Sequence, residues 1–171
     1  MYPDNKEKLD FARHVLQAKA RDHARTPVQW TAEENAGFCA PGIKPWMRVN
    51  DDYKTINAEA QRKFQDPEKL SVLQFWKRAL SNRKEHKSVF VYGDFELLDK
   101  DNDSVFAYRR FDADEAFVVV LNFSKKDVKW SLPKEAKVQK WVAGTYDGTP
   151  SQSTSGEITI RPYEGLLGEQ W

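Results

Sequence analysis

The sequence predicts a mixed α and β protein in two parts: a helical part over residues 1–88 and an antiparallel β-sandwich over residues 89–171. Before residue 88 the apolar residues recur at helical spacing. After it they come in short β-branched or aromatic runs separated by turn residues. The net charge changes at the same point, from +5 over the first part to −4 over the second. We therefore expect a boundary near residues 87–92.

Two helices are predicted in the first part. Apolar residues recur every three or four positions over residues 6–20, which is the spacing of one helix face. A second helix is expected over residues 67–86, because Asp66 can cap its free N–H groups and Pro67 suits its first turn. Its apolar face consists of Val72, Leu73, Trp76, Ala79 and Leu80. Residues 21–66 show no sustained period, and so long a loop is often functional.

The second part is predicted to consist of six to eight strands at spacings of about ten residues, which is typical of an antiparallel sandwich. Residues 117–121 are continuously apolar and should form the central strand. Trp130 and Trp141 are expected in the core, and residues 148–156 form a low-complexity loop. The expected strands are residues 88–92, 95–98, 104–111, 116–123, 128–132, 138–143, 157–160 and 163–167.

Composition excludes several classes of protein. A net charge of +1 argues against a basic nucleic-acid binder, so no nucleic-acid partner is expected. The single cysteine, Cys39, excludes an intramolecular disulfide and a cysteine-based zinc site. No apolar run approaches the roughly 18 residues of a membrane helix, and residues 1–10 contain no signal-peptide core. The sequence therefore predicts a cytoplasmic protein without a membrane partner.

The densest polar cluster runs from Arg21 through Asp22 and His23 to Arg25. A guanidinium presents forked donors that suit a carboxylate, a phosphate or neighbouring sugar hydroxyls. The alternative is that these cations only stabilise the end of the first helix. The three histidines, His14, His23 and His86, show no metal-binding spacing, so neither a metal nor a cofactor is expected.

Acidic and aromatic residues in the loop give weaker signals. The acid pairs at residues 33–34 and 51–52 are expected to be solvated. Glycosidase chemistry needs two carboxyl groups about 5–5.5 or 6.5–9.5 Å apart on a stiff frame, and no such frame is marked here. Trp30, Trp46 and Tyr53 could stack on sugar rings, although anchoring the loop to a core is the favoured interpretation.

An ordered set of short motifs runs through most of the chain. It consists of Arg21–Trp30, Asn35-Ala36-Gly37-Phe38, Lys44-Pro45-Trp46, Val49-Asn50, Tyr53, Ile56-Asn57, Ser71-Val72-Leu73, Arg83-Lys84, Phe90–Leu97 and Leu121-Asn122-Phe123. This set resembles the α-glucosidase branch of the α-amylase family of glycoside hydrolases, which includes maltases, isomaltases and oligo-1,6-glucosidases. The form of the first motif is most similar to that of fungal maltase-like enzymes.

The resemblance implies that residues 1–88 are the end of a (β/α)8 barrel, with an active-site loop and the last barrel helix, and that residues 89–171 are the C-terminal sandwich. Such enzymes hydrolyse terminal α-glucosidic bonds of maltose-, isomaltose- or sucrose-like oligosaccharides with retention. Their Asp nucleophile, Glu acid/base and second Asp lie on earlier barrel strands. The sequence contains no Asn-His-Asp motif, so none of its residues is expected to be catalytic. The chain should be inactive alone and should pair with an upstream barrel segment.

One functional position carries over from the family. The Arg of its Arg-Thr-Pro element reaches the glucose in the −1 subsite, and this residue is Arg25 here. Arg21, Asp22 and His23 would be supporting residues. The alternative function is a non-catalytic carbohydrate-binding or interaction module. The fragment interpretation also predicts an exposed apolar patch on residues 1–88, and it would lose support if Leu9, Val15, Leu73 and Trp76 were all buried.

Overall fold

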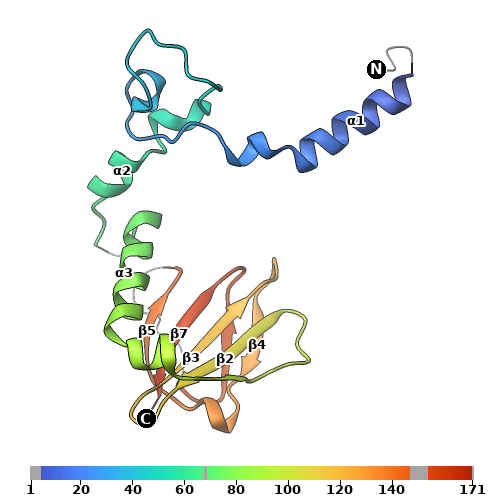
Figure 1. Cartoon of the computed structure of the whole chain (residues 1–171). Helices are drawn as coiled ribbons and strands as arrows, with labels where there is room; N and C mark the ends of the chain where they lie inside the picture. Colours follow the sequence, from blue (N-terminus) through green and yellow to red (C-terminus); the bar gives the residue numbers. More distant parts are fainter. Residues whose placement is uncertain (1–4, 68, 147–153, 171) are drawn as a thin grey trace. The chain divides into compact units, whose positions relative to one another are not determined.

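A computed structural model of the chain describes residues 5–67, 69–146 and 154–170 (Figure 1). The chain divides into two compact units, unit 1 over residues 1–63 and unit 2 over residues 64–171. The second long helix is thus in the same unit as the strands. The domain boundary near residues 87–92 is predicted from composition and charge, and it stays a prediction.

Unit 1 contains one long helix, α1 (Lys6–Lys19), which confirms the helix predicted over residues 6–20. It begins after Asn5, whose side chain accepts a hydrogen bond of 3.0 Å from the Lys8 N–H, as a helix N-cap does. The region predicted to lack a period holds only short elements. They are the 3-10 helices η1 (Arg21–Ala24), η2 (Glu34–Gly37) and η3 (Asp51–Lys54), and the helix α2 (Ala58–Lys63).

The second long helix, α3 (Val72–Glu85), begins five residues later than predicted. Ser71 and Gln74 form a capping box, in which each side chain accepts a hydrogen bond from the other residue's N–H. Asp66, the predicted cap, instead accepts a hydrogen bond of 2.9 Å from the Lys69 N–H in a separate turn. The reciprocal cap at Ser71 satisfies two N–H groups, so the helix starts there.

The run at residues 88–92 is a helical turn, η4 (Ser88–Tyr92), and its prediction as a strand was wrong. The Phe90 N–H donates to the His86 carbonyl over 2.9 Å, so helical hydrogen bonding continues from the end of α3 into η4. Val89 is buried, and its carbonyl accepts hydrogen bonds from the Arg110 guanidinium. A short apolar run fits a buried helical turn as well as a strand, which explains the error.

The remaining strands are confirmed and form two antiparallel sheets. Their bounds are β1 (Asp94–Leu97), β2 (Val105–Phe111), β3 (Ala116–Asn122), β4 (Val128–Ser131), β5 (Val138–Gly144), β6 (Glu157–Ile160) and β7 (Gly165–Gln170), with a 3-10 turn η5 (Lys134–Ala136) before β5. The five-stranded sheet has the order β1-β2-β3-β7-β5, so the continuously apolar β3 is its middle strand, as predicted. The second sheet pairs β4 with β6.

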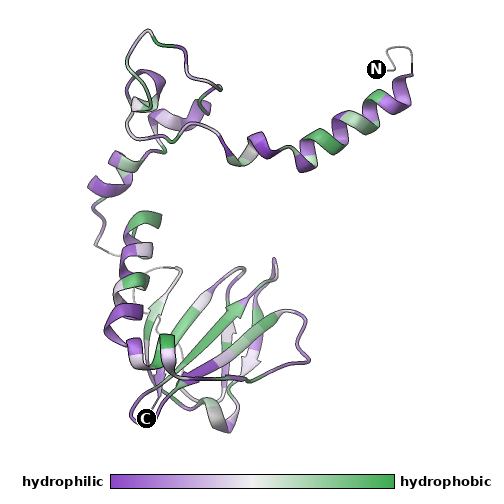
Figure 2. Cartoon of the chain, in the orientation of Figure 1, coloured by the Kyte–Doolittle hydropathy of each residue, from purple (hydrophilic) through white to green (hydrophobic). Residues whose placement is uncertain are grey.

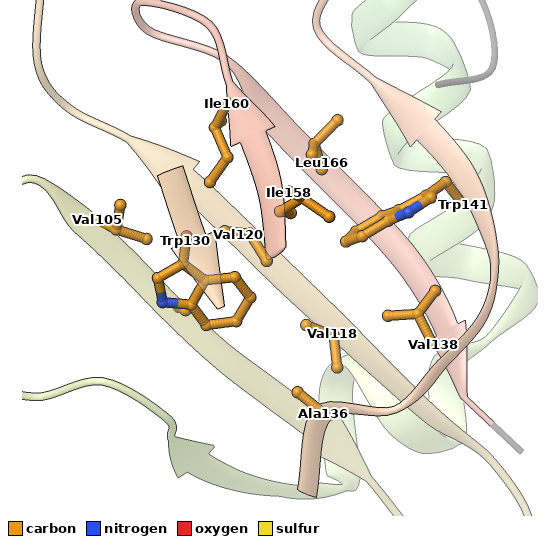
Figure 3. Close-up of a cluster of buried hydrophobic side chains, with 11 residues drawn as sticks. Val105, Val118, Val120, Trp130, Ala136, Val138, Trp141, Ile158, Ile160 and Leu166 are labelled. Carbon is orange, nitrogen blue, oxygen red and sulfur yellow. The ribbon is translucent and has the colours of Figure 1, made fainter. Parts of the chain in front are cut away.

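The core of unit 2 lies on one face of the five-stranded sheet (Figure 3). Alternate residues of β3, Val118 and Val120, point to this face together with residues from β4 and β6. Trp130 and Trp141 are both buried there, as predicted. The Trp130 Nε1–H donates to Asp99 over 2.9 Å, so the indole is buried with its polar group satisfied.

The buried side-chain amide of Asn122 forms hydrogen bonds at the end of β3. The Asn122 side chain is 2% exposed, and its Nδ2 lies 2.8 Å from the Lys126 carbonyl, 3.1 Å from that of Ile160 and 2.9 Å from that of Arg161. Its Oδ1 accepts a hydrogen bond of 2.8 Å from the Ser124 N–H. The same side chain therefore holds the turn after β3 and the end of β6.

Candidate functional site

The predicted cluster of Arg21, Asp22, His23 and Arg25 begins directly after α1. Residues 21–24 form η1, and the Arg25 N–H closes this turn with a hydrogen bond of 3.1 Å to the Asp22 carbonyl. The side chains of Arg21, Asp22 and Arg25 are exposed, while that of His23 lies outside the described residues. Nothing in the described part of the chain bonds to the Arg25 guanidinium, whose donors are available to a ligand.

The segment after Arg25 is held by a second segment near α2. The Gln29 Nε2 donates to the Ile56 carbonyl over 2.6 Å and to the Asp52 carboxylate over 3.1 Å. The Ala58 N–H donates in turn to the Gln29 carbonyl over 2.9 Å. Pro27, two residues before Gln29, is buried. The chain at Gln29, four residues after Arg25, is therefore held by hydrogen bonds to residues 52–58.

The Asn35-Ala36-Gly37 motif is a turn with three consecutive positive φ angles, of 57°, 55° and 65°. Asn and Gly tolerate this left-handed region better than other residues. A Cβ on Gly37 would lie 2.7 Å from the Thr31 hydroxyl oxygen, so a side chain does not fit there. The Asn35 Nδ2 donates to the carbonyls of Ala40 and Ile43 over 3.2 and 2.9 Å. The motif shapes the loop, and its role is structural.

Replacing Asn35 by alanine should loosen this turn. The Asn35→Ala variant loses two side-chain hydrogen bonds and puts a less tolerant residue at a positive φ, which we expect to cost unit 1 about 1–3 kcal/mol. Limited proteolysis should then cut residues 33–46 several times faster than in the wild-type chain, at unchanged stability of unit 2. Equal cleavage rates in the two proteins would contradict this role for Asn35.

Asn57, the second residue of the Ile56-Asn57 motif, is buried. Its Oδ1 accepts a hydrogen bond of 2.8 Å from the Ala60 N–H, as an N-cap of α2, and its Nδ2 donates to the Tyr53 carbonyl over 2.9 Å. Asparagine is among the preferred N-cap residues, so its place just before α2 could have revealed this role.

Two of the three loop aromatics are exposed in this structure, Trp30 to 52% and Trp46 to 60%. The interpretation that they anchor the loop to a core stays a prediction. Tyr53 is partly buried and lines a cavity of about 400 Å³. The other residues of this cavity are Glu34, Asn35, Lys44, Pro45, Met47, Arg48 and Val49. Its exposed lining is mainly apolar, and the side chains of Glu34, Asn35 and Arg48 already have partners within the loop.

Several acidic residues of the loop have structural partners. Glu34 accepts a hydrogen bond of 2.8 Å from the Gly42 N–H, and Asp51 forms an ion pair with Arg48. A hydrogen bond of 2.6 Å from Lys63, together with its positive charge, lowers the pKa of Glu59. A glycosidase acid needs a raised pKa instead, because it must hold a proton near neutral pH. Glu59 is therefore unsuited to that role.

Both long helices expose apolar residues, as the fragment interpretation predicts. Neither α1 nor α3 contains a buried residue. Val15 and Trp76 are exposed, and Leu9 and Leu73 are only partly buried. Figure 2 shows hydrophobic and hydrophilic residues alternating along both helices, which is the pattern of helices with one apolar face. In the described part of the chain, no helix is long and apolar enough to cross a membrane.

Comparison with protein families decides where the chain belongs. A model of the α-amylase catalytic domain matches residues 3–93, more than half of the chain. The chain belongs to the α-amylase family. A model of the C-terminal domain of maltogenic amylase matches residues 95–166. Both matches agree with the resemblance of the sequence motifs to the α-amylase family.

Curated family members cover almost the whole chain. This chain is 38% identical to the α-glucosidase MAL12 and to the oligo-1,6-glucosidase IMA3 of Saccharomyces cerevisiae, in each case over 96% of this chain and 27% of the relative. An α-glucosidase of Schizosaccharomyces pombe is 34% identical over 95% of this chain and 27% of its own length. The chain thus spans about a quarter of the length of these relatives.

Solved structures of family members have the same fold as this chain. The trehalose-6-phosphate hydrolase TreA of Bacillus licheniformis is 34% identical, with a TM-score of 0.77 over 91% of this chain and 27% of that chain. The isomaltulose synthase PalI of Klebsiella sp. LX3 is 32% identical, with a TM-score of 0.75 over 87% of this chain and 25% of that chain. The mixed fold with a C-terminal antiparallel sandwich is thereby confirmed.

Proposed function

We propose that this chain is the C-terminal part of a retaining α-glucosidase that hydrolyses terminal α-glucosidic bonds of maltose-, isomaltose- or sucrose-like oligosaccharides. The observation that carries the proposal is identity of 38% to an α-glucosidase along 96% of this chain. An oligo-1,6-glucosidase matches equally well, which supports the same reaction on either linkage. The single cysteine is in keeping with a reduced, cytoplasmic location for the enzyme.

Residues 1–88 would be the end of the catalytic barrel, and residues 89–171 the C-terminal sandwich. Two family models support this division, because the catalytic-domain match ends at residue 93 and the C-terminal match begins at residue 95. The loop after Arg25 would then belong to the C-terminal face of the barrel, where the active sites of such barrels lie.

Arg25 would bind the glucose unit in the −1 subsite, with Arg21, Asp22 and His23 as supporting residues. Its guanidinium is exposed, and the chain four residues later is tied at Gln29 to residues 52–58, which supports this role. A fixed fork of donors can hold two neighbouring sugar hydroxyls at once, because its N–H groups are coplanar. Such a clamp selects the end of a sugar chain.

Bond cleavage would need carboxylates from an upstream barrel segment. In a retaining glycosidase one carboxylate attacks the anomeric carbon and a carboxylic acid protonates the leaving oxygen, after which water hydrolyses the glycosyl-enzyme. No Asn-His-Asp motif stands in this sequence, and Glu34, Asp51 and Asp52 of the loop are engaged in the contacts above. This chain would therefore supply substrate binding and support.

The isolated chain should have no glucosidase activity. Pure protein is incubated with p-nitrophenyl α-glucoside, and the release of nitrophenol is compared with that in buffer. We expect the two rates to be equal, because the attacking and proton-donating carboxylates are not supplied by this chain. Turnover above buffer that co-purifies with the chain through two columns would overturn the assignment of catalysis to an upstream segment.

The second candidate function is a non-catalytic carbohydrate-binding module. The exposure of Trp30 and Trp46 favours it, because aromatic faces bind the apolar side of sugar rings. Titration of the isolated chain with maltose or soluble glucan, followed by tryptophan fluorescence, tests this candidate. Saturable binding that is lost in Trp46→Ala and kept in Arg25→Ala would favour the module over the glucosidase part.

A further inference from the structure

Gln29 joins two segments of unit 1 that lie far apart in the sequence. Its Nε2 donates to the Ile56 carbonyl over 2.6 Å and to the Asp52 carboxylate over 3.1 Å. Among the side chains that the structure describes in residues 21–30, Gln29 alone bonds to a distant described segment. Backbone hydrogen bonds of 2.9 Å, from the N–H groups of residues 58 and 59 to the carbonyls of residues 29 and 30, follow the same path. Side chain and backbone thus join the same two segments.

The segment that Gln29 contacts is itself folded. Asp52 lies in η3, and Ile56 is followed by the buried Asn57. The Asn57 side chain caps α2 through the Ala60 N–H and donates to the Tyr53 carbonyl over 2.9 Å. The two acceptors of the Gln29 amide are therefore held by structure of their own, so that they restrict Gln29 in turn.

The chain between Arg25 and Gln29 has few free torsions. Pro27 is buried, and its ring fixes its own φ. A residue before a proline is restricted to extended conformations, so Thr26 has little freedom as well. On the other side, the Arg25 N–H is bonded to the Asp22 carbonyl over 3.1 Å at the end of η1. A constraint at Gln29 is therefore passed on to the backbone of Arg25.

We propose that Gln29 is a positioning residue for Arg25, whose guanidinium it keeps at the place where the terminal glucose unit binds. The inference rests on the proposed function, because the role of Arg25 as a substrate ligand comes from it. A displacement of about 1 Å in a site can cost about 100-fold in rate. A residue that acts only through Arg25 can therefore still control activity.

Trypsin tests the constraint on this chain directly, because it cleaves the peptide bond after Arg25. The Gln29→Glu variant keeps the size of the side chain and loses its amide donor. The new carboxylate cannot donate to the Ile56 carbonyl and is repelled by Asp52. The matched control is Gln17→Glu on α1, which makes the same chemical change at an exposed position away from these contacts.

We expect cleavage after Arg25 to be at least about fivefold faster in Gln29→Glu than in the wild-type chain, because the segment opens more often. Cleavage after Arg13 on α1 should stay unchanged, and Gln17→Glu should be cleaved like the wild type. Adding Asp52→Asn to Gln29→Glu supplies an amide that can donate to the new carboxylate, so part of the protection should return. Equal cleavage after Arg25 in wild type and Gln29→Glu would overturn the proposal. An equal increase after Arg13 would also overturn it, because unit 1 as a whole would then have loosened.

A double-mutant cycle tests whether the constraint acts on the substrate through Arg25. Gln29→Glu and Arg25→Ala are made singly and together in a chimera that joins the part of MAL12 upstream of its matched segment to this chain. We expect Gln29→Glu to lower kcat/KM for maltose by about tenfold when Arg25 is present and by less than about twofold when it is absent, since a positioning residue acts only through its partner. Equal losses in both backgrounds would overturn the positioning role and leave the proposed function standing.

The trypsin measurement does not depend on glucosidase activity, so the two proposals can fail separately. If the Arg25→Ala chimera is as active as the unsubstituted chimera, the proposed substrate role of Arg25 is wrong. Faster cleavage after Arg25 in Gln29→Glu would then still support the constraint that Gln29 places on its backbone.

Discussion

The Asn122→Asp variant should lose about 3–5 kcal/mol of the stability of unit 2, which is the loss expected for an uncompensated buried charge. The wild-type amide nitrogen lies within 3.1 Å of three carbonyl oxygens. A carboxylate in its place has no proton to donate and would be repelled by all three. Since single domains are typically stable by about 5–15 kcal/mol, the change removes a large share of the total. Urea denaturation followed by tryptophan fluorescence measures it.

The destabilisation by Asn122→Asp should grow with pH. Burial among carbonyls raises the folded-state pKa of the new carboxyl group above its unfolded value of about 3.9. The folded state then binds more protons than the unfolded state, so the variant loses stability relative to wild type as the pH rises above about 4. The partly exposed Asn82 serves as a control, because Asn82→Asp makes the same chemical change with a cost of about 1 kcal/mol or less. Equal losses in both variants would contradict the role of Asn122.

The Arg25→Ala variant, made in a chimera that joins the part of MAL12 upstream of its matched segment to this chain, should lower kcat/KM for maltose by about 10- to 150-fold. This range corresponds to the roughly 1.5–3 kcal/mol of hydrogen bonds from a charged group. Arg25→Lys should recover little activity, because an ammonium group lacks the planar fork. Arg13→Ala on α1 is the control, since Arg13 is exposed and pairs only with Asp10 among the described residues. A fully active Arg25→Ala chimera would remove Arg25 from the substrate site.

The sandwich could be predicted from the sequence because its strands carry strong local signals. Residues 117–121 are continuously apolar, and only a strand in the middle of the sheet places both faces of such a run against other residues. The run at residues 88–92 has similar composition but forms a helical turn. Its conformation is set by the preceding helix and by Arg110, which is far away in the sequence, so local pattern could not reveal it.

The site could be located from the sequence only in part. The family motif predicts a sugar-binding role for Arg25, whose side chain is exposed, and this role stays a prediction; the residues alone left open that Arg25 only stabilises the end of a helix. The structural role of the Asn35-Ala36-Gly37 motif follows from its three positive φ angles, which the sequence does not show. The exposure of Trp30 and Trp46 could not be derived from the sequence, because it depends on the small size of the core that unit 1 forms.

The most direct test is the activity of three proteins on p-nitrophenyl α-glucoside: this chain, the upstream part of MAL12, and the chimera that joins them. We expect neither part to hydrolyse the substrate and the chimera to reach a kcat/KM within about 100-fold of MAL12 itself, a difference of about 2.7 kcal/mol in the barrier. A folded chimera with no turnover, or an upstream part as active as the chimera, would contradict the assignment of this chain to an α-glucosidase.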